Sequence, residues 1–274
     1  MKSNKQNKHL NPESTVPEPI NVICIKWGKV YPPDYVNKLN NMVRRNTKYK
    51  INFYCFTDKD NGLDSNIIVK PIPTIKVIPN GCFKRETAFF SPDLGGLKGK
   101  RVFYFDLDIV IVGKLDALFS YPQDDDFYII KDWASSGDRV GQGSCFSWII
   151  SNKYNDITSE YENNKSEIDH KYGTASQEYL SDKILEKQGK LKFWPDMWFC
   201  SFRFHCLPNP LARYIQIPKI PKNDELKVIV FHGHPNPEEA QEGIWPDKKK
   251  HRKKFWKKIY KHCLPTPWIK DYWH

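Results

Sequence analysis

The spacing of apolar side chains divides the chain into alternating strand-like and helix-like segments. Short apolar runs rich in β-branched and aromatic residues predict strands. These runs are Asn21–Lys26, Ile51–Thr57, Asn66–Lys70, Arg101–Asp106, Phe127–Lys131, Cys145–Ile150 and Leu226–Phe231. Apolar positions spaced three or four residues apart predict helices after Pro33 and over 83–90 and 176–187. Strands that alternate with helices favour an α/β fold, with a mainly parallel central sheet and helices on both faces.

The predicted elements occupy the middle of the chain. Residues 1–20 are polar and interrupted by prolines, which predicts a disordered leader rather than a secretory signal. One domain is expected over 21–246, followed by a basic, aromatic segment over 247–274. A membrane-spanning helix needs about 18 or more consecutive apolar residues, and none is predicted. The seven cysteines include no C-x-x-C pair, which favours a reduced, cytoplasmic environment.

The formal net charge of +11 is concentrated near the C-terminus. Nine Lys and Arg residues lie in Lys248–Lys261, without an acidic residue among them. Phe255, Trp256, Ile259 and Tyr260 are spaced to share one helical face. The segment is therefore either a helix that docks on the domain or an attachment to anionic lipid headgroups. Nucleic-acid binding is less favoured, because no recognition motif accompanies the charge.

Two acids separated by one residue follow the most apolar predicted strand. Asp106 and Asp108 end the run Arg101–Asp106, and residues i and i+2 of an extended segment point the same way. Two carboxylates held side by side repel each other, and a divalent cation would remove that repulsion. Oxygen ligands suit Mn²⁺ or Mg²⁺, which would bridge a nucleotide diphosphate. The alternative is a solvated D-x-D in a turn.

The same motif has a second catalytic interpretation. Phosphatases of the haloacid dehalogenase type also use D-x-D after an apolar strand, with the first Asp as nucleophile. Their motif normally lies on the first strand of the domain, whereas two or three strand units precede Asp106 here. A glycosyltransferase, in which the nucleotide-binding half comes before the D-x-D, fits this order better. A non-catalytic basic interaction module is a third alternative.

Three segments resemble bacterial GT-A glycosyltransferases, most closely the family 8 galactosyl- and glucosyltransferases of lipopolysaccharide synthesis. They are Trp27–Tyr31, Phe56–Asp58 and, above all, Arg101–Asp116, within a resemblance that extends over 21–240. The resemblance implies a GT-A (Rossmann-like) fold and transfer of a hexose from a nucleoside-diphosphate sugar, with UDP the favoured carrier. It implies Mn²⁺ or Mg²⁺ as cofactor and a glycan or lipid-linked acceptor. The expected location is cytoplasmic, with peripheral attachment to the inner face of a membrane as an option.

The resemblance also implies roles for individual residues. The metal ligands are Asp106, Asp108 and His232. Donor binding falls to Ile25, Lys26, Trp27, Asp58, Arg85 with Lys84 as its alternative, Ser144 and His234. Gln177 and Glu178 flank the reacting carbon. Two positions depart from the family pattern: Ser176 stands where an Asp is usual, and His234 replaces a phosphate-binding lysine.

His232 follows the last predicted strand and precedes a tight loop with Gly233, Pro235 and Pro237. A histidine ligand must be neutral at the nitrogen that binds the metal. Donor affinity in Mn²⁺ is therefore expected to fall below a pH of about 6.5, the ordinary pKa of histidine.

Overall fold

A computed structural model describes residues 19–79, 81–135, 137–246 and 261–274. Its main sheet has seven strands in the order β3-β2-β1-β4-β7-β6-β8. Their bounds are β1 Ile20–Lys26, β2 Ile51–Thr57, β3 Ile68–Pro71, β4 Arg101–Phe105, β6 Tyr128–Lys131, β7 Gly141–Ile149 and β8 Lys192–Phe193. Every pairing is parallel except those of β7, which runs antiparallel to both β4 and β6. The expected mainly parallel sheet is confirmed.

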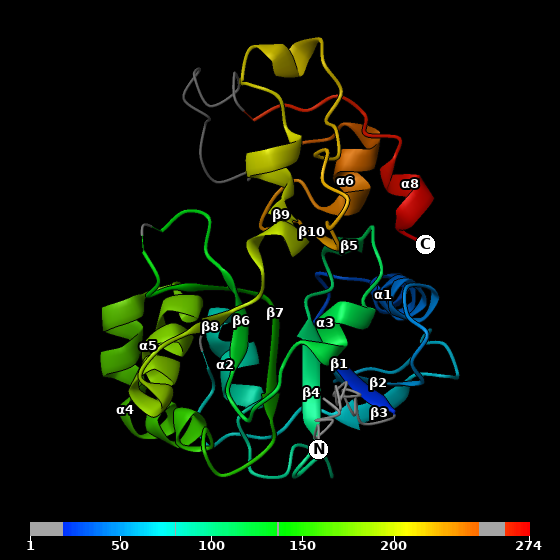
Figure 1. Ribbon diagram of the computed structural model, residues 1–274. Coiled ribbons are helices and arrows are strands. Elements are labelled where there is room, and N and C mark those ends of the chain that lie inside the picture. The colour runs from blue at the N-terminus through cyan, green and yellow to red at the C-terminus, as the bar shows by residue number, and fades with distance from the viewer. Residues whose placement is uncertain (1–18, 80, 136, 247–260) are drawn as a thin grey trace, which may run out of the picture.

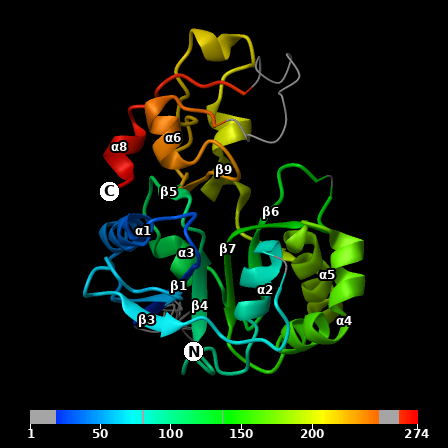
Figure 2. The ribbon, with the colours of Figure 1, turned by 180° about the vertical axis from the view of Figure 1, so that it is seen from behind.

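Helices cover both faces of this sheet, as expected (Figures 1 and 2). On one face, α1 (Pro33–Arg45) packs its apolar stripe against alternate residues of β1, β2 and β4. On the other, α2 (Lys84–Ala88), α4 (Asp156–Tyr172) and α5 (Ser176–Gln188) share a second core. Burial on both faces explains the almost wholly apolar sequence of β4.

A smaller sheet lies above the carboxyl ends of the main strands (Figure 1). It has the order β5-β10-β9, with β5 Ile109–Ile111, β9 Phe199–Ser201 and β10 Val228–Val230. Five short helices accompany it or connect the sheets: α3 Asp116–Ser120, η2 Asp196–Trp198, η4 Ala212–Tyr214, α6 Pro237–Glu242 and α8 Ile269–Tyr272. The helix η3 (Phe202–Cys206) is a single π-turn directly after β9. Another short turn, η1 (Gly81–Phe83), precedes α2.

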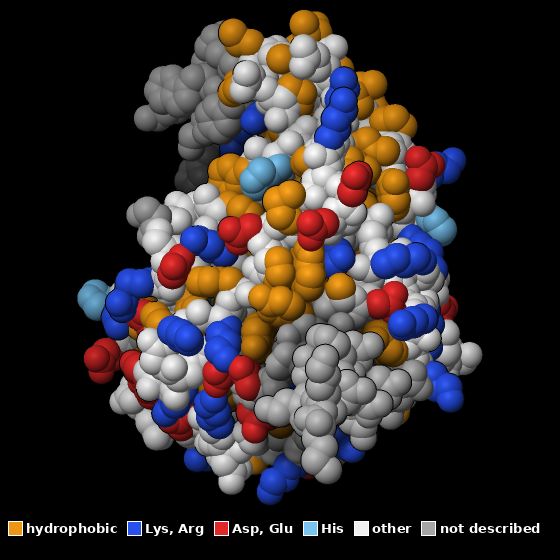
Figure 3. Space-filling model, in the orientation of Figure 1, with side chains coloured by type: hydrophobic (Ala, Val, Ile, Leu, Met, Phe, Trp, Pro, Cys, Tyr) orange, Lys and Arg blue, Asp and Glu red, His pale blue; other side chains and the backbone are white. Residues whose placement is uncertain are grey.

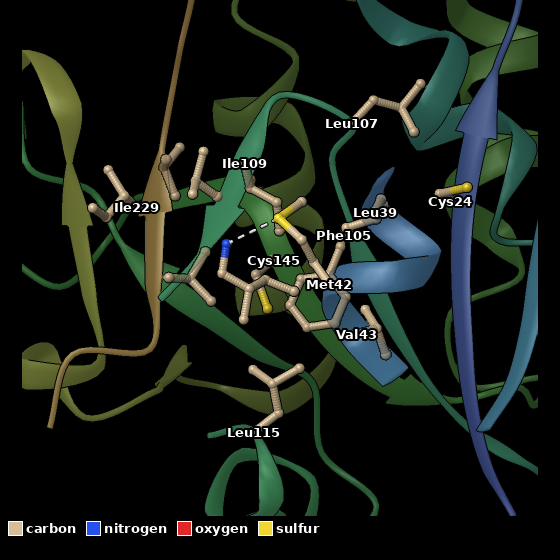
Figure 4. Close-up of a cluster of buried hydrophobic side chains, with 14 of the residues drawn as sticks. Cys24, Leu39, Met42, Val43, Phe105, Leu107, Ile109, Leu115, Cys145 and Ile229 are labelled. Atoms are coloured by element: carbon tan, nitrogen blue, oxygen red, sulfur yellow. Dashed lines mark hydrogen bonds between the residues drawn. The ribbon is translucent and has the colours of Figure 1, made fainter. Parts of the chain in front are cut away.

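One apolar cluster joins the two sheets. Figure 4 shows Met42 of α1 lying between Phe105 at the end of β4 and Ile109 of β5. The backbone N–H of Ile111 donates to the sulfur of Met42 at 3.4 Å. Ile229 of β10 belongs to the same cluster. Because β4 and β5 flank Asp106–Asp108, this packing fixes the segment that carries both acids.

The observed elements differ from the expected ones in several places. The third strand begins at Ile68 rather than Asn66, and β7 begins at Gly141 rather than Cys145. Helix α4 was not predicted, because few of its side chains are buried and Asn164 interrupts it with non-helical angles. Strands β5 and β9 have three residues each, too short for periodicity to detect.

Residues 1–18 of the expected leader and the basic stretch 248–260 lie outside the described residues, while Ile20, the last residue of that leader, already belongs to β1. The chain beyond them does pack onto the domain: the ring of Trp273 is 4% exposed and meets Tyr35 edge-on at 4.9 Å. Among the described residues, no helix is long and apolar enough to cross a membrane.

Candidate functional site

The paired acids lie where the strand order of the main sheet reverses. Strands β1 and β4 are parallel neighbours, although two strands separate them in the chain. In open α/β sheets ligands bind beyond the carboxyl ends of the strands at such a point. A cavity of about 240 Å³ opens there, lined by Ile25, Lys26, Trp27, Val30, Tyr31, Tyr104, Asp106, Leu107 and Asp108. Five of the residues singled out from the sequence therefore meet in one cavity.

Asp106 is held by a buried arginine. The guanidinium of Arg85 contacts both carboxylate oxygens of Asp106 at 3.3 Å and donates to the carbonyl of Gly143 at 2.9 Å. Burial alone would lower the pKa of Arg85, but the charges of Glu86 and Asp106 raise it above its usual value. A Cβ on Gly143 would lie 2.5 Å from Arg85, so glycine is needed for this approach. Tyr104 also donates a hydrogen bond to Asp106.

Among the described residues, no cation forms a hydrogen bond or salt bridge with the carboxylate of Asp108. Its side chain accepts a hydrogen bond of 2.9 Å from the hydroxyl of Tyr31. Burial, followed by the negative charge of Asp106, raises the pKa of Asp108 to about 8. Burial and the nearby Asp108 charge likewise raise the pKa of Tyr31, so its hydroxyl remains a donor. Asp108 is therefore a buried carboxyl whose ionised form needs a positive partner.

The charges around the cavity fit a divalent cation. Lys26 and Arg85 contribute two positive charges, while Glu86, Asp106 and Asp108 contribute three negative charges when ionised, which leaves an excess of one negative charge. Within the part of the chain that is described, no three His, Cys, Asp or Glu side chains gather closely enough to hold a metal. Two carboxylates nevertheless suit Mg²⁺-like ions, which bind through one or two carboxylates together with substrate phosphates.

The residue before His232 is bonded to the backbone of Asp108, whereas the ring of His232 is bonded to Ser201. The N–H of Phe231 donates to the carbonyl of Asp108 at 3.0 Å. The ring Nε2 of His232 lies 2.7 Å from the hydroxyl of Ser201. Its role as third metal ligand remains a prediction. Burial, and then the charge of Arg203, lower the pKa of His232 to about 4. With this pKa, competition between a proton and a metal at His232 is expected near pH 4 rather than near pH 6.5, and the pH dependence of donor affinity remains a prediction.

Other predicted donor-binding residues surround the neighbouring strand ends. Asp58, after β2, accepts a hydrogen bond of 3.1 Å from the N–H of Gly28 and so ties two loops together. Asp58 and Lys84 both line a second cavity of about 510 Å³. Ser144 is buried behind the acids: its carbonyl accepts from the N–H of Asp106 at 2.9 Å. Its hydroxyl is bonded to Gln142, so it supports the site from within the sheet.

Gln177 and Glu178 begin helix α5, beside α2. The hydroxyl of Ser176 donates to Glu86 at 3.0 Å, which links the start of α5 to the residue that binds Arg85. Glu86 therefore supplies a carboxylate next to the position where the family pattern has an Asp and this chain has Ser176. The Oε2 atom of Glu178 is buried without a hydrogen-bond partner among the described residues. His234 instead bonds Glu239 of α6 at 2.8 Å, and its predicted phosphate contact remains untested.

Three residues of the site were not identified from the sequence. Tyr31 lies within the quoted segment Trp27–Tyr31 but had no assigned role. Glu86 is the neighbour of Arg85 on a predicted helix. A charged side chain next to a predicted phosphate contact was the signal that could have identified it. Trp133, which faces the ring of His232 at 6.2 Å, follows β6 and carried no sequence signal.

No family model matches this sequence, and no curated protein matches it. Solved structures do. The galactosyltransferase LgtC, in complex with donor and acceptor sugar analogs, matches with a TM-score of 0.53 at 12% identity, over 92% of this chain and 99% of LgtC. An active-site mutant of LgtC matches with a TM-score of 0.52 at 11% identity, over 91% and 99%. The glycosyltransferase GlyE of Streptococcus pneumoniae matches with a TM-score of 0.54 at 14% identity, over 80% of this chain and 56% of GlyE.

At such low identity the likeness concerns the fold. It extends over most of this chain and nearly the whole length of LgtC. The expected GT-A arrangement is therefore confirmed: the chain has the fold of the glycosyltransferases LgtC and GlyE.

Proposed function

We propose that this protein is a metal-dependent glycosyltransferase that moves a hexose from a nucleoside-diphosphate sugar, UDP being the favoured carrier, to a glycan or lipid-linked acceptor. The observation that carries the proposal is the pair Asp106 and Asp108 at the end of β4, with one carboxylate matched by Arg85 and the other unmatched. The likeness to two glycosyltransferases over most of the chain supports it.

Asp106 and Asp108 would hold Mn²⁺ or Mg²⁺ at the mouth of the cavity. A bound ion of this kind supplies Lewis-acid stabilisation of the leaving diphosphate. Arg85 fixes the orientation of Asp106, and Tyr31 orients Asp108 by its hydrogen bond. Such bonds to ligating carboxylates tune a metal site. By resemblance to the family, His232 would be the third ligand.

The remaining donor-binding and reacting groups are assigned by resemblance to the family. Three residues at the end of β1 line the cavity, namely Ile25, Lys26 and Trp27. They would hold the base and ribose. Lys84 lies across the second cavity from Asp58 and would approach the diphosphate. Gln177 and Glu178, in the first turn of α5, would flank the reacting carbon.

The basic stretch 248–261 would attach the enzyme to an anionic membrane surface on the cytoplasmic side. Each Lys or Arg near such a surface contributes about 1 kcal/mol. Because Trp273 packs in the core, deletion of the whole C-terminus would disturb the fold. Replacing Lys248, Lys249 and Lys250 by Gln is a cleaner test: co-sedimentation with phosphatidylserine vesicles should fall, and unchanged sedimentation would remove the membrane claim.

The phosphatase alternative is not favoured. In the sheet, three strands precede β4, so the D-x-D is not on the first strand of the domain. Likewise, nothing among the described residues adds a nucleic-acid motif to the basic stretch.

A thermal-shift screen of nucleotide sugars, with and without Mn²⁺, tests the proposal. Ligand binding raises the free energy of unfolding by RT ln(1 + [L]/Kd), so a donor at about 100 times its Kd contributes about 2.7 kcal/mol. A UDP-sugar should raise the melting temperature in Mn²⁺, and EDTA should abolish the shift. Release of phosphate from a phosphomonoester, with no response to any nucleotide sugar, would contradict it.

A further inference from the structure

A loop at the small-sheet end of the molecule exposes several large apolar side chains close together. It covers residues 207–218, between η3 and β10. Leu211 is 78% exposed and Ile215 is 80% exposed, while Tyr214 and Ile217 are each nearly half exposed. Single exposed apolar side chains are normal on a soluble protein, but a group within one short loop indicates a contact surface. We call residues 207–218 the apolar loop.

The apolar loop is closed at its base and braced from within. The N–H of Lys219 donates to the carbonyl of Cys206 at 3.0 Å, which joins the two ends of the loop. Inside it, Nε of Arg213 donates to the carbonyl of Pro208 at 2.9 Å. In Figures 1 and 2 the yellow segment that contains the loop forms the tip of the molecule, on the side of the small sheet that faces away from the main sheet. A compact loop with joined ends projects its side chains as one unit.

The surroundings of the apolar loop are positively charged. From 197 to 223 the sequence contains no acidic residue, and its Lys and Arg residues there are Arg203, Arg213, Lys219 and Lys222. Figure 3 shows apolar and basic side chains together at this tip on the face in view. A tip that is both apolar and basic is complementary to a layer that is anionic at its surface and apolar beneath it.

The described residues on either side of the basic stretch 248–260 lie against the same region. Before the stretch, the ring centroid of Trp245 lies 5.9 Å from the guanidinium carbon of Arg203. After the stretch, the ring of His262 stacks on Tyr214 of the apolar loop, with centroids 4.3 Å apart and planes 11° apart. The most basic part of the chain is therefore joined to the fold beside the apolar loop on both sides.

We infer that the apolar loop inserts into the interface of an anionic membrane. Leu211, Ile215 and Ile217 would enter the boundary between headgroups and acyl chains, and the basic residues around them would contact the headgroups. Tyr214 suits the same boundary, where amphipathic rings are enriched. A projecting tip of aliphatic side chains fits a bilayer, which deforms around it, whereas a folded partner would need a matching groove. The inference rests on the proposed function for the use of such insertion, access to a lipid-linked acceptor, but not for the insertion itself.

Flotation with vesicles of phosphatidylcholine and phosphatidylserine tests the inference at low salt and in about 1 M NaCl, where the Debye length is only about 3 Å. Attachment by charge alone should vanish in high salt, whereas an inserted loop should keep part of the binding. Leu211→Ser and Ile215→Ser should each weaken vesicle binding about tenfold at both salt concentrations, which corresponds to about 1.4 kcal/mol for the apolar surface lost from the membrane. Neither variant changes the net charge, so a loss of binding cannot come from altered electrostatics.

Val69→Ser is the matched control. Val69 is an apolar side chain, 41% exposed, on the edge strand β3 of the main sheet, and its replacement should leave vesicle binding unchanged. Equal binding by Leu211→Ser, Ile215→Ser and the unmodified protein would overturn the inference. Complete loss of binding by the unmodified protein in high salt would also overturn it. Sedimentation velocity without vesicles covers a second copy of the chain as the partner: a dimer that the two loop variants dissociate, with vesicle binding unchanged, would replace the membrane by that copy.

UDP binding in Mn²⁺ is measured on the same samples, because the loop is outside the donor cavity and its variants should bind UDP normally. If no sample binds UDP but the loop variants lose the vesicles, the proposed function fails and the insertion stands. If every sample binds UDP and vesicle binding ignores the loop, the proposed function stands and the inference fails.

Discussion

The chain contains three pairs of acids with D-x-D spacing, the first being Asp58 with Asp60, and the other two have opposite surroundings. Asp106 and Asp108 follow β4 at the strand-order reversal. Asp124 and Asp126 precede β6, which lies beside the edge strand β8. Lys192 forms salt bridges with both Asp124 and Asp126, the latter at 2.8 Å.

The two pairs differ in their protonation. Hydrogen bonds from Lys153 and Lys192 lower the pKa of Asp126. Burial alone would raise the pKa of Asp124, but the hydrogen bond from Lys192 lowers it overall. Asp108 has its pKa raised to about 8. Spacing alone therefore does not identify a cation site: the informative feature is a carboxylate that the fold buries without a positive partner.

The largest expected effect separates the two pairs by function. Asp108→Asn should weaken UDP binding in Mn²⁺ by at least about 100-fold, because even outer partners of a metal site change affinity by 10- to 100-fold. Asp124→Asn should leave UDP binding unchanged, because lysines already match its pair. Isothermal titration of UDP into each variant measures both. Equal losses in the two variants would show that the comparison is wrong.

The second effect is the pH dependence of Mn²⁺ affinity. Binding a cation at Asp108 displaces its proton, so Mn²⁺ affinity should fall about tenfold per pH unit as the pH drops below about 8. His232 cannot explain a fall in this range, since its pKa is lowered to about 4. Electron paramagnetic resonance of free Mn²⁺ between pH 5.5 and 8.5 gives the slope. If the midpoint of the pH profile of Mn²⁺ binding were near pH 6.5, an ordinary histidine rather than Asp108 would control the binding.

A smaller effect compares two tyrosines. Tyr31 donates to Asp108 at 2.9 Å, and Tyr128 donates to Asp124 at 3.2 Å. The hydrogen bond from Tyr31 favours the ionised form of Asp108. Tyr31→Phe should therefore lower Mn²⁺ affinity at pH 7 about fivefold, and move the midpoint of the pH profile upward. Tyr128→Phe should leave both unchanged. An increase in Mn²⁺ affinity for Tyr31→Phe would mean that Tyr31 competes with the ion.

The smallest effect is on stability without metal, and it has opposite signs at the two pairs. Asp108 holds its proton up to about pH 8 when folded, but only to about 3.9 when unfolded. Its contribution to stability is therefore lost as the pH rises through about 8. Asp108→Asn removes this loss and should stabilise the protein at pH 8.5 by about 1 kcal/mol or more, with little effect below about pH 4.

Asp126 has a lowered pKa, so its contribution is present above about pH 3.9 and lost as the pH falls through the folded value. Asp126→Asn should destabilise by a few tenths of a kcal/mol, because the pair is near the surface. Thermal melts in EDTA at pH 5 and 8.5 measure both variants. A lower melting temperature for Asp108→Asn than for the unmodified protein at pH 8.5 would contradict the claim that the ionised carboxylate of Asp108 destabilises the metal-free protein.

Six of the seven strands of the main sheet could be predicted because each lies in an apolar run of the sequence, whereas the two-residue β8 could not. Residues Ile51–Thr57 were assigned without error, and β4 differs from its prediction by one residue. Of the smaller sheet only β10 was predicted, within the run Leu226–Phe231, since the three-residue strands β5 and β9 have no period. Its strands depend on contacts between segments more than 100 residues apart in the chain, such as Ile109 with Val230.

Those residues of the site that lie at the ends of strands could be predicted, because the end of an apolar run is visible in the sequence. Asp106, Asp108 and the end of β1 meet because parallel strands end at the same edge of the sheet. The orientation of the His232 ring toward Ser201 and the pairing of Glu86 with Arg85 depend on side-chain packing, which a single sequence does not encode as a pattern. The same limit explains why Trp133 carried no signal.

The central claim is that Asp106 and Asp108 bind a nucleotide diphosphate through a divalent cation. Calorimetric titration of UDP into the unmodified protein, in Mn²⁺ and again in EDTA, tests this claim directly, with uridine as the control that lacks phosphate. The account predicts that UDP binds in Mn²⁺, that EDTA weakens the binding at least about 100-fold, and that uridine gains nothing from Mn²⁺. UDP binding of equal affinity in Mn²⁺ and EDTA would contradict it.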